Sequence, residues 1–249
     1  MSPALPLTPG DVHLWYALLD APAPPDWPER CQAVLSVDET ARQQRFHFEK
    51  DRRSFLLSHG LLRFVLSAYR PDVPPITWRF VRGTHGKPLL ADATMGLSFN
   101  LTHTMGLAAV AVVRDLEVGV DAEFTERSNA SLGLAERFFA PAETATLRGL
   151  DGEALRSGFF NFWTLKEAYI KARGVGLALP LDGFAFDLQP GRAPCISFTE
   201  RIVDDPSSWE FAQFQATVSH RLAVAVRRPP SQRLTFTLRR WVPGLDDSR

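Results

Sequence analysis

The chain contains two copies of one pattern, and this repeat restricts the possible folds more than any other feature. In residues 102–112 a threonine and a histidine precede a run of alanine and valine, and residues 219–226 repeat the pattern from a serine and a histidine. Each copy follows a segment with the spacing of a long helix, 38–69 and 152–173. Two copies of one α+β unit fit the 249 residues, because domains usually have roughly 100–150 residues. Alanine–valine strands also resemble one another by chance, so both interpretations stay open at this point.

Residues typical of helix ends support the expected helices. Asp38 is in position to cap the first long helix, and Pro71 lies just past its end. Gly174 ends the second, because glycine tolerates positive φ at a helix C-terminus. A third helical region covers 131–139, and the proline-rich segment 21–28 indicates a loop. Alternating or β-rich runs predict strands over 12–18, 76–82, 97–113 (two strands), 117–124, 183–188, 195–198, 209–218, 221–227 and 234–241.

Composition excludes several classes of protein. The 28 basic and 28 acidic side chains balance, so the chain has no general attraction for nucleic acid or anionic lipid. Cys31 and Cys195 have no CxxC partner, which argues against a disulfide framework or a structural zinc site. The N-terminus shows no signal-peptide pattern, and no apolar run approaches the roughly 20 residues that span a bilayer. We therefore expect a cytoplasmic protein that binds neither nucleic acid nor membrane.

Two carboxylates are spaced to act together in the expected strand 117–124. Asp121 and Glu123 are two residues apart, so their side chains point to the same face. Two clustered carboxylates repel each other and stay ionised only beside a cation or strong donors. A hard cation such as Mg²⁺ is the natural partner. The alternative is a solvated pair at the end of a strand.

The helix 152–173 carries a second stripe of candidate residues. Trp163, Glu167 and Lys171 recur every four residues and share one face. Glu167 and Lys171 could form an ordinary surface ion pair worth about 0.3–0.5 kcal/mol, and Trp163 could simply pack in the core. A face that carries both a tryptophan and this charged pair is expected to be half buried.

Two shorter features could bind phosphate or nucleotide. Thr102 and His103 offer a hydroxyl and an imidazole beside the end of a strand. Gly86, Lys87 and Pro88 form a turn that could present backbone groups and one ammonium. Taken alone, a structural histidine and an ordinary turn are the simpler interpretations.

Together these features resemble the Sfp-type 4'-phosphopantetheinyl transferases. The signatures of that family are a G-[VI]-D-x-E strand and, later in the chain, W-x-x-K-E-[AS]-x-x-K-x-x-G-x-G-L; they correspond here to 119–123 and 163–177. The G-K-P and [ST]-H elements precede them in the expected order, and the resemblance extends from about residue 38 to 227. Further matches in the family's order are Phe138, Phe139, Glu143 and the run 179–182.

The resemblance implies an α+β fold: a pseudo-dimer of two similar lobes, each a long helix packed on a small antiparallel sheet, with coenzyme A bound between them. We expect an N-terminal lobe over 1–114, a C-terminal lobe with the metal site over 115–229, and a C-terminal extension, strand or tail, over 230–249. A fused pseudo-dimer is expected to be a monomer.

The resemblance also implies a reaction, the transfer of 4'-phosphopantetheine from coenzyme A to a serine of an apo carrier protein, acyl, aryl or peptidyl. Asp121, Glu123 and Glu167 would hold Mg²⁺. Glu167, directly or through a metal-bound water, would act as general base. Lys171 would contact the phosphate, so the catalytic set is Glu167, Lys171 and Asp121. Ala122, where the family has Ile or Val, should only reduce packing behind the metal.

The same resemblance implies how coenzyme A is held. Thr102 and His103 would bind phosphates, and Gly86, Lys87 and Pro88 would lie near the adenine. Arg42 occupies the position of a basic contact to the 3'-phosphate. A second basic position corresponds here to Glu39, with Arg52 and Arg53 as alternatives.

Two other functions remain open from the sequence. A metal-dependent nucleotide phosphohydrolase could use the same carboxylates without a protein acceptor. A non-catalytic binding module could use them only to cap strands and helices. If the chain is a transferase, the segment 125–139 is the expected surface for the acceptor.

Overall fold

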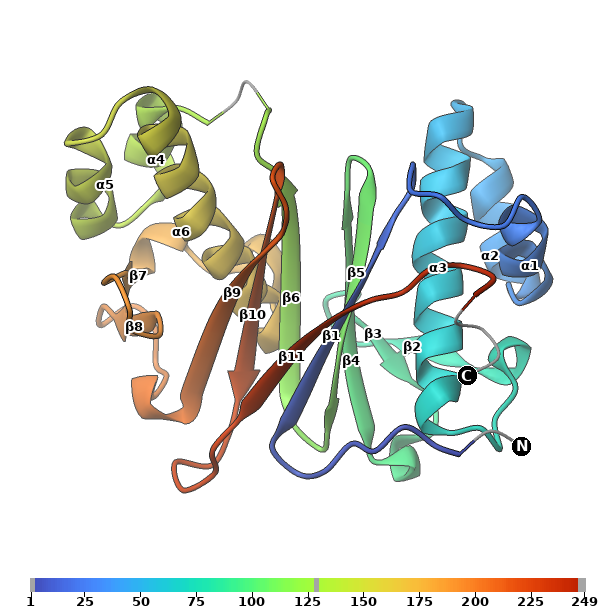
Figure 1. Cartoon of the computed structure of the whole chain (residues 1–249). Helices are drawn as coiled ribbons and strands as arrows, with labels where there is room; N and C mark the ends of the chain where they lie inside the picture. Colours follow the sequence, from blue (N-terminus) through green and yellow to red (C-terminus); the bar gives the residue numbers. More distant parts are fainter. Residues whose placement is uncertain (1–2, 128–129, 246–249) are drawn as a thin grey trace. The chain divides into compact units, whose positions relative to one another are not determined.

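The structure is a computed structural model that describes residues 3–127 and 130–245 (Figure 1). The chain divides into two compact units. The first consists of residues up to 81, 88–115 and 235 onward, and the second of 82–87 and 116–234. The sequence led us to place the boundary at 114/115, with a separate extension after 229. Residues 82–87 instead group with the second unit, and the end of the chain groups with the first.

The first unit packs a long helix on a four-stranded sheet. Helix α3 covers one face of the sheet, whose strand order is β11-β1-β5-β4. Leu57, Leu61 and Leu66 of α3 are almost completely buried in the core on that face. The elements are β1 (Asp11–Leu18), α1 (Trp27–Ala33), α2 (Val37–Gln44), α3 (Glu49–Tyr69), β2 (Phe80–Arg82), β3 (Pro88–Leu90), β4 (Leu97–Thr104), β5 (Leu107–Arg114) and β11 (Thr235–Arg240).

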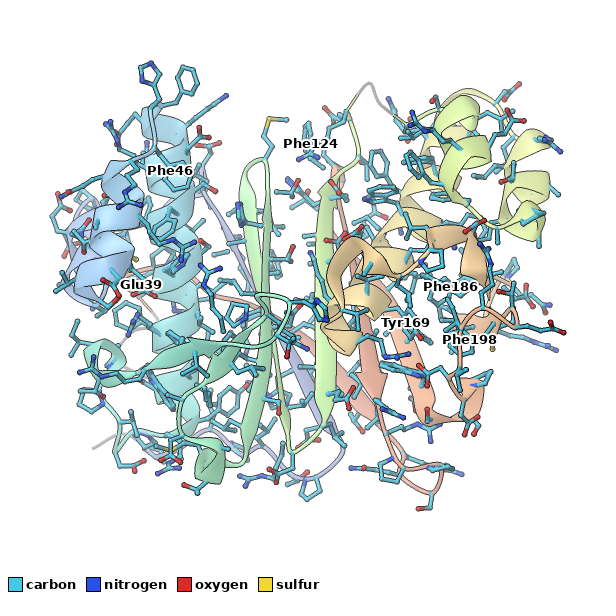
Figure 2. All side chains as sticks on the ribbon, turned by 180° about the vertical axis from the view of Figure 1, so that it is seen from behind. Glu39, Phe46, Phe124, Tyr169, Phe186 and Phe198 are labelled. Atoms are coloured by element: carbon cyan, nitrogen blue, oxygen red, sulfur yellow. The ribbon has the colours of Figure 1, made fainter. Side chains whose placement is uncertain are left out.

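The second unit repeats this plan with a three-stranded sheet, β6-β10-β9, under helix α6. Tyr169 of α6 lies at its core, with ring centroids 4.9 Å from Phe184 and 5.6 Å from Phe198 (Figure 2). The elements are β6 (Glu117–Phe124), α4 (Leu132–Phe138), α5 (Pro141–Arg148), α6 (Gly152–Arg173), β7 (Phe184–Asp187), β8 (Cys195–Phe198), β9 (Trp209–Thr217) and β10 (His220–Arg227). Short 3-10 turns lie at Pro75–Thr77, Ala93–Met95, Gly176–Ala178, Leu181–Gly183 and Pro206–Ser208.

The two units have the same internal order, which confirms the expected pair of similar α+β lobes. In each, a strand is followed by a long helix and then by a hairpin whose second strand lies in the middle: β1-β5-β4 in one unit and β6-β10-β9 in the other. The repeated sequence pattern coincides with these hairpins, β4–β5 and β9–β10. Strand β11 has no counterpart and pairs with β1 in parallel, so the first sheet is mixed rather than purely antiparallel.

Several local expectations are corrected. The helical segment 38–69 is two helices, α2 and α3, and the N-cap of α2 is Ser36 rather than Asp38. Helix α1 begins within the segment expected to be a loop, because a proline fits the first turn of a helix. Helix α5 was not anticipated. Of the described helices, none is both long and apolar enough to cross a membrane.

Candidate functional site

Strand β6 and helix α6 lie unusually close together at Gly119. A Cβ atom built on Gly119 would lie 2.1 Å from the carbonyl oxygen of Ala168 and 2.3 Å from the amide nitrogen of Ala172. Any larger side chain would therefore push the helix away from the strand. Asp121 and Glu123 follow Gly119 at the two-residue spacing of a strand, so they share its helix-facing side. The glycine of the first signature thus allows the carboxylates to reach the helix.

Asp121 pairs with the lysine of the helical stripe. The Lys171 ammonium lies 2.5 Å from Asp121 Oδ1. Asp121 is only 4% exposed, and its second oxygen, Oδ2, is buried without a hydrogen-bond partner among the described residues. A buried carboxylate oxygen without a donor is costly unless a cation or a ligand donor occupies the space beside it.

Glu123 contacts one residue of α6 and one residue that follows β6 in the chain. Its Oε1 accepts a hydrogen bond of 3.1 Å from the indole nitrogen of Trp163. Its Oε2 lies 3.1 Å from the Arg127 guanidinium, close enough for an ion pair but not aligned as a hydrogen bond. Burial and the nearby charge of Asp121 raise the pKa of Glu123 to about 7.

Glu167 belongs to the same electrostatic group. Burial raises its pKa, the charge of Asp121 adds to this effect, and Lys171 opposes it. Asp121 is thus close enough to perturb both Glu123 and Glu167. No group of three or more His, Cys, Asp or Glu side chains is arranged to hold a metal ion anywhere in the described part of the chain. The charge of Asp121 therefore acts on both Glu123 and Glu167, and the Lys171 ammonium forms an ion pair with Asp121.

The chemical type of these donors suits a hard cation. Magnesium prefers carboxylate oxygens, and one buried oxygen of Asp121 lacks a donor among the described residues. Burial raises the pKa values of Glu123 and Glu167, and the negative charge of Asp121 adds to this effect. A divalent ion beside Asp121 would lower both pKa values and stabilise the ionised group.

The G-K-P turn places its lysine on backbone carbonyls. Lys87 Nζ donates to the carbonyl oxygens of Val118, at 2.8 Å, and Ala172, at 3.0 Å. Burial lowers the pKa of Lys87 to about 8. Gly86 has a φ of 85°, a conformation that favours glycine, and Pro88 begins β3.

The remaining sequence candidates lie in the first unit. Thr102 and His103 are neighbours on β4, with Thr102 buried and His103 exposed. Arg42 is exposed near the end of α2, with its guanidinium 5.7 Å from the centroid of the Phe55 ring. His59 also stacks on that ring, with centroids 3.7 Å apart.

His59 is a neighbour of these groups that sequence reasoning missed, because it belongs to no motif. Burial lowers its pKa to about 4, Glu39 raises it, and the charges of Arg42 and His103 lower it further. Arg42 and His103 therefore each lie within electrostatic reach of His59.

Arg52 and Arg53, the alternatives for a second basic contact to coenzyme A, interact with side chains close to them, and Glu39 has a structural role. Glu39 closes a capping box with Ser36 and lies 2.7 Å from Nη2 of the buried Arg63 (Figure 2 labels Glu39). Arg52 pairs with Glu49, and the guanidinium of Arg53 lies over the ring of Trp27.

The lysine beside Glu167 in the second signature is also structural. Lys166 and Glu143 form an ion pair of 2.7 Å with both side chains fully buried. The ammonium donates to the carbonyl oxygens of Leu181 and Phe184, and the carboxylate accepts from the amide of Phe186. The pair fastens α5 and α6 to the start of β7.

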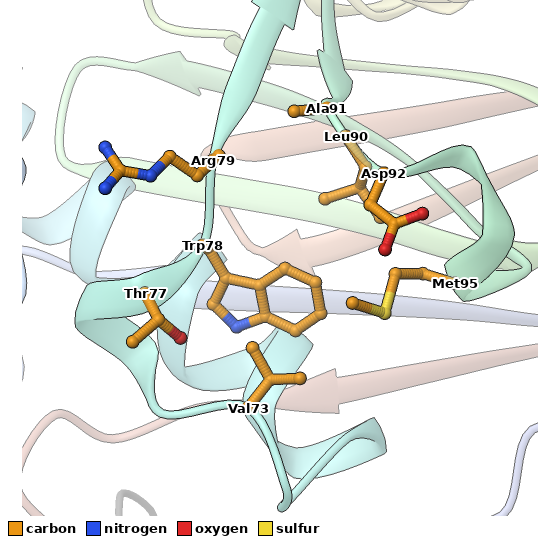
Figure 3. Close-up of a pocket in the computed structure, with 8 residues that line it drawn as sticks. All are labelled: Val73, Thr77, Trp78, Arg79, Leu90, Ala91, Asp92 and Met95. Atoms are coloured by element: carbon orange, nitrogen blue, oxygen red, sulfur yellow. The ribbon is translucent and has the colours of Figure 1, made fainter.

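A pocket of about 310 Å³ lies apart from all these candidates (Figure 3). Its walls include Trp78, Leu90 and Met95, with Arg79 and Asp92 also lining it. None of the site's carboxylates, lysines or histidines lines this pocket, so the pocket is separate from the candidate site.

Comparison with known proteins identifies the family. A family model described as 4'-phosphopantetheinyl transferase superfamily matches residues 117–226, and one described as 4'-phosphopantetheinyl transferase, N-terminal, matches 21–114. The chain is 39% identical over 211 residues to the 4'-phosphopantetheinyl transferase HetI of Nostoc sp., covering 82% of this chain and 87% of HetI. It is 29% identical to the transferase Sfp of Bacillus subtilis, over 88% of this chain and 93% of Sfp. The two signatures, the repeated units and these relatives agree: the chain belongs to the Sfp-type 4'-phosphopantetheinyl transferases, which transfer 4'-phosphopantetheine from coenzyme A to carrier proteins.

Proposed function

We propose that the carboxylates of β6 and α6 form the catalytic centre of this transferase and that the centre is magnesium-dependent. The observation that carries the proposal is the buried Oδ2 of Asp121, which has no hydrogen-bond partner in 3–127 or 130–245 and lies near two glutamates with raised pKa values. Asp121, Glu123 and Glu167 would hold the ion. When bound, magnesium would neutralise charge on the pyrophosphate of coenzyme A and on the leaving group.

The side chains of the chain itself have distinct roles in this proposal. Trp163 fixes Glu123 through its indole hydrogen bond. The serine oxygen of the carrier attacks the phosphorus that bears the pantetheine arm, and the bond from that phosphorus to adenosine 3',5'-bisphosphate breaks. Glu167 accepts the serine proton as the general base. Lys171 places its positive charge beside the transferred phosphoryl group.

Coenzyme A would be recognised by residues of both signatures and of the upstream elements. In this proposal Arg42, Thr102 and His103 bind its phosphates, and the backbone of Gly86 and Pro88 contacts the adenine. The effect of both Arg42 and His103 on His59 supports their joint role. The enzyme would act as a cytoplasmic monomer on acyl, aryl or peptidyl carrier proteins, of fatty-acid, polyketide or nonribosomal peptide assembly.

One assay tests the proposed centre. The protein is incubated with coenzyme A, Mg²⁺ and an apo carrier protein, and the carrier is weighed by mass spectrometry. We expect a gain of one phosphopantetheine, no gain in EDTA, and recovery when Mg²⁺ is restored. Glu167→Gln should abolish transfer and keep the wild-type circular dichroism spectrum. Full activity in chelator would refute the metal, and near wild-type turnover of the variant would refute the role of Glu167.

A further inference from the structure

Lys87 occupies an unusual position for a residue of a nucleotide-binding turn. Its ammonium is partly buried and donates to the carbonyl oxygens of Val118, on β6, and Ala172, in the last turn of α6. Its aliphatic stem also lies against Gly174, where a Cβ would be 3.4 Å from Lys87 Cδ. The side chain therefore joins the strand and the helix that carry the carboxylates.

Each of the two carbonyls needs a donor from outside its own element. Ala172 is one residue from the end of α6, and the last four carbonyls of a helix lack an intrahelical partner. The negative end of the helix dipole favours a cation at this place. Val118 lies on β6, which is an edge strand in the described sheet. Lys87 satisfies both groups at once.

The two carbonyls flank the closest approach of β6 and α6. Gly119, which follows Val118, is the residue whose missing side chain lets Ala168 and Ala172 come near. On the strand, Asp121 is three residues from Val118; on the helix, Lys171 immediately precedes Ala172. The two hydrogen bonds of Lys87 hold β6 and α6 together here. They fix the distance between strand and helix on which the Asp121–Lys171 contact of 2.5 Å depends.

We propose that the Lys87 side chain is a positioning residue that clips β6 to α6, so that it supports turnover through the protein backbone and not by contacting coenzyme A. The inference rests on the proposed function only in taking Asp121 and Lys171 as part of the reactive centre. It replaces the expectation from family resemblance that Lys87 lies near the adenine, which the neighbouring Gly86 and Pro88 could still contact through their backbone.

Steady-state kinetics separate the two roles. Lys87→Met keeps an unbranched side chain out to Cε and removes its donors, and a displacement near 1 Å at a catalytic centre can cost up to about 100-fold in rate. We expect kcat to fall at least about tenfold while KM for coenzyme A changes less than about threefold. The same fall in kcat is expected when 3'-dephospho-coenzyme A replaces coenzyme A as the substrate. Lys87→Arg, which retains donors, should recover part of kcat. Lys50→Met removes an exposed ammonium and should change neither constant.

The wild-type protein gives a second readout that needs no variant to fold. The ammonium protons of Lys87 should exchange slowly in ¹⁵N NMR, and their signal should stay in place when coenzyme A is added. A rise in KM with unchanged kcat, unaltered kinetics of Lys87→Met, or a shift of this signal by coenzyme A would overturn the proposal. If Glu167→Gln is inactive and Lys87→Met is active, only the positioning role of Lys87 is refuted. If Glu167→Gln is active, the proposed catalytic centre is refuted.

Discussion

Gly119→Ala tests the physical basis of the site most directly. The added Cβ would lie 2.1 Å from the carbonyl oxygen of Ala168, whereas such contacts essentially never fall below 3.0 Å. Strand and helix must therefore separate locally by about 0.9 Å, which is the overpacking that usually costs about 1–3 kcal/mol of stability. The obstructing atoms belong to the backbone of α6, so a change of rotamer cannot relieve the clash.

The same displacement should damage catalysis more than stability. The Asp121–Lys171 contact of 2.5 Å bridges the two elements that must separate. A shift near 1 Å can reduce turnover by up to about 100-fold, and we expect a loss of about ten- to 100-fold in kcat/KM for carrier modification. Urea unfolding measures the change in stability, and mass analysis of the carrier measures turnover.

Gly149→Ala is the matched control. Gly149 is the C-cap of α5 with a φ of −83°, and a Cβ added there would lie 3.8 Å from the carbonyl oxygen of Thr146, an ordinary van der Waals contact. Because this backbone conformation suits an L residue, the variant should be as stable as the wild type or slightly more so. If Gly119→Ala matched the control in both stability and turnover, the close approach of β6 and α6 would not be what the activity requires.

Two further predictions concern buried charge. Glu143→Ala leaves the fully buried Lys166 without its carboxylate and should lower the urea-unfolding free energy by about 3–5 kcal/mol; Glu136→Ala, at an exposed pair with Arg148, should cost less than about 1 kcal/mol, and equal losses would contradict this account. Burial and Asp121 raise the pKa of Glu123 from 4.5 to about 7, so in chelator the folded state binds this proton more tightly than the unfolded state, and the contribution of Glu123 to stability falls as pH rises between these values. Urea unfolding of Glu123→Gln across this range should lack that decline, and identical pH slopes for the two proteins would refute it.

The sequence alone determined the family and many of the local elements. Helix α6 runs from Gly152 to Arg173, as its spacing and Gly174 predicted, because helical periodicity and a glycine stop act over a few residues. The signatures around Asp121 and Glu167 identified the family before any fold was known, since the residues of each signature are adjacent in the chain.

Tertiary structure alone decided which partners these residues meet. Lys87 donates to carbonyls 31 and 85 residues away, and β11 returns from the end of the chain to pair with β1. Glu39 occupies the position of a second basic contact to coenzyme A, yet it forms an ion pair with the buried Arg63 inside the first unit. Such pairings depend on burial and on long-range packing, and periodicity along the sequence carries no information about either.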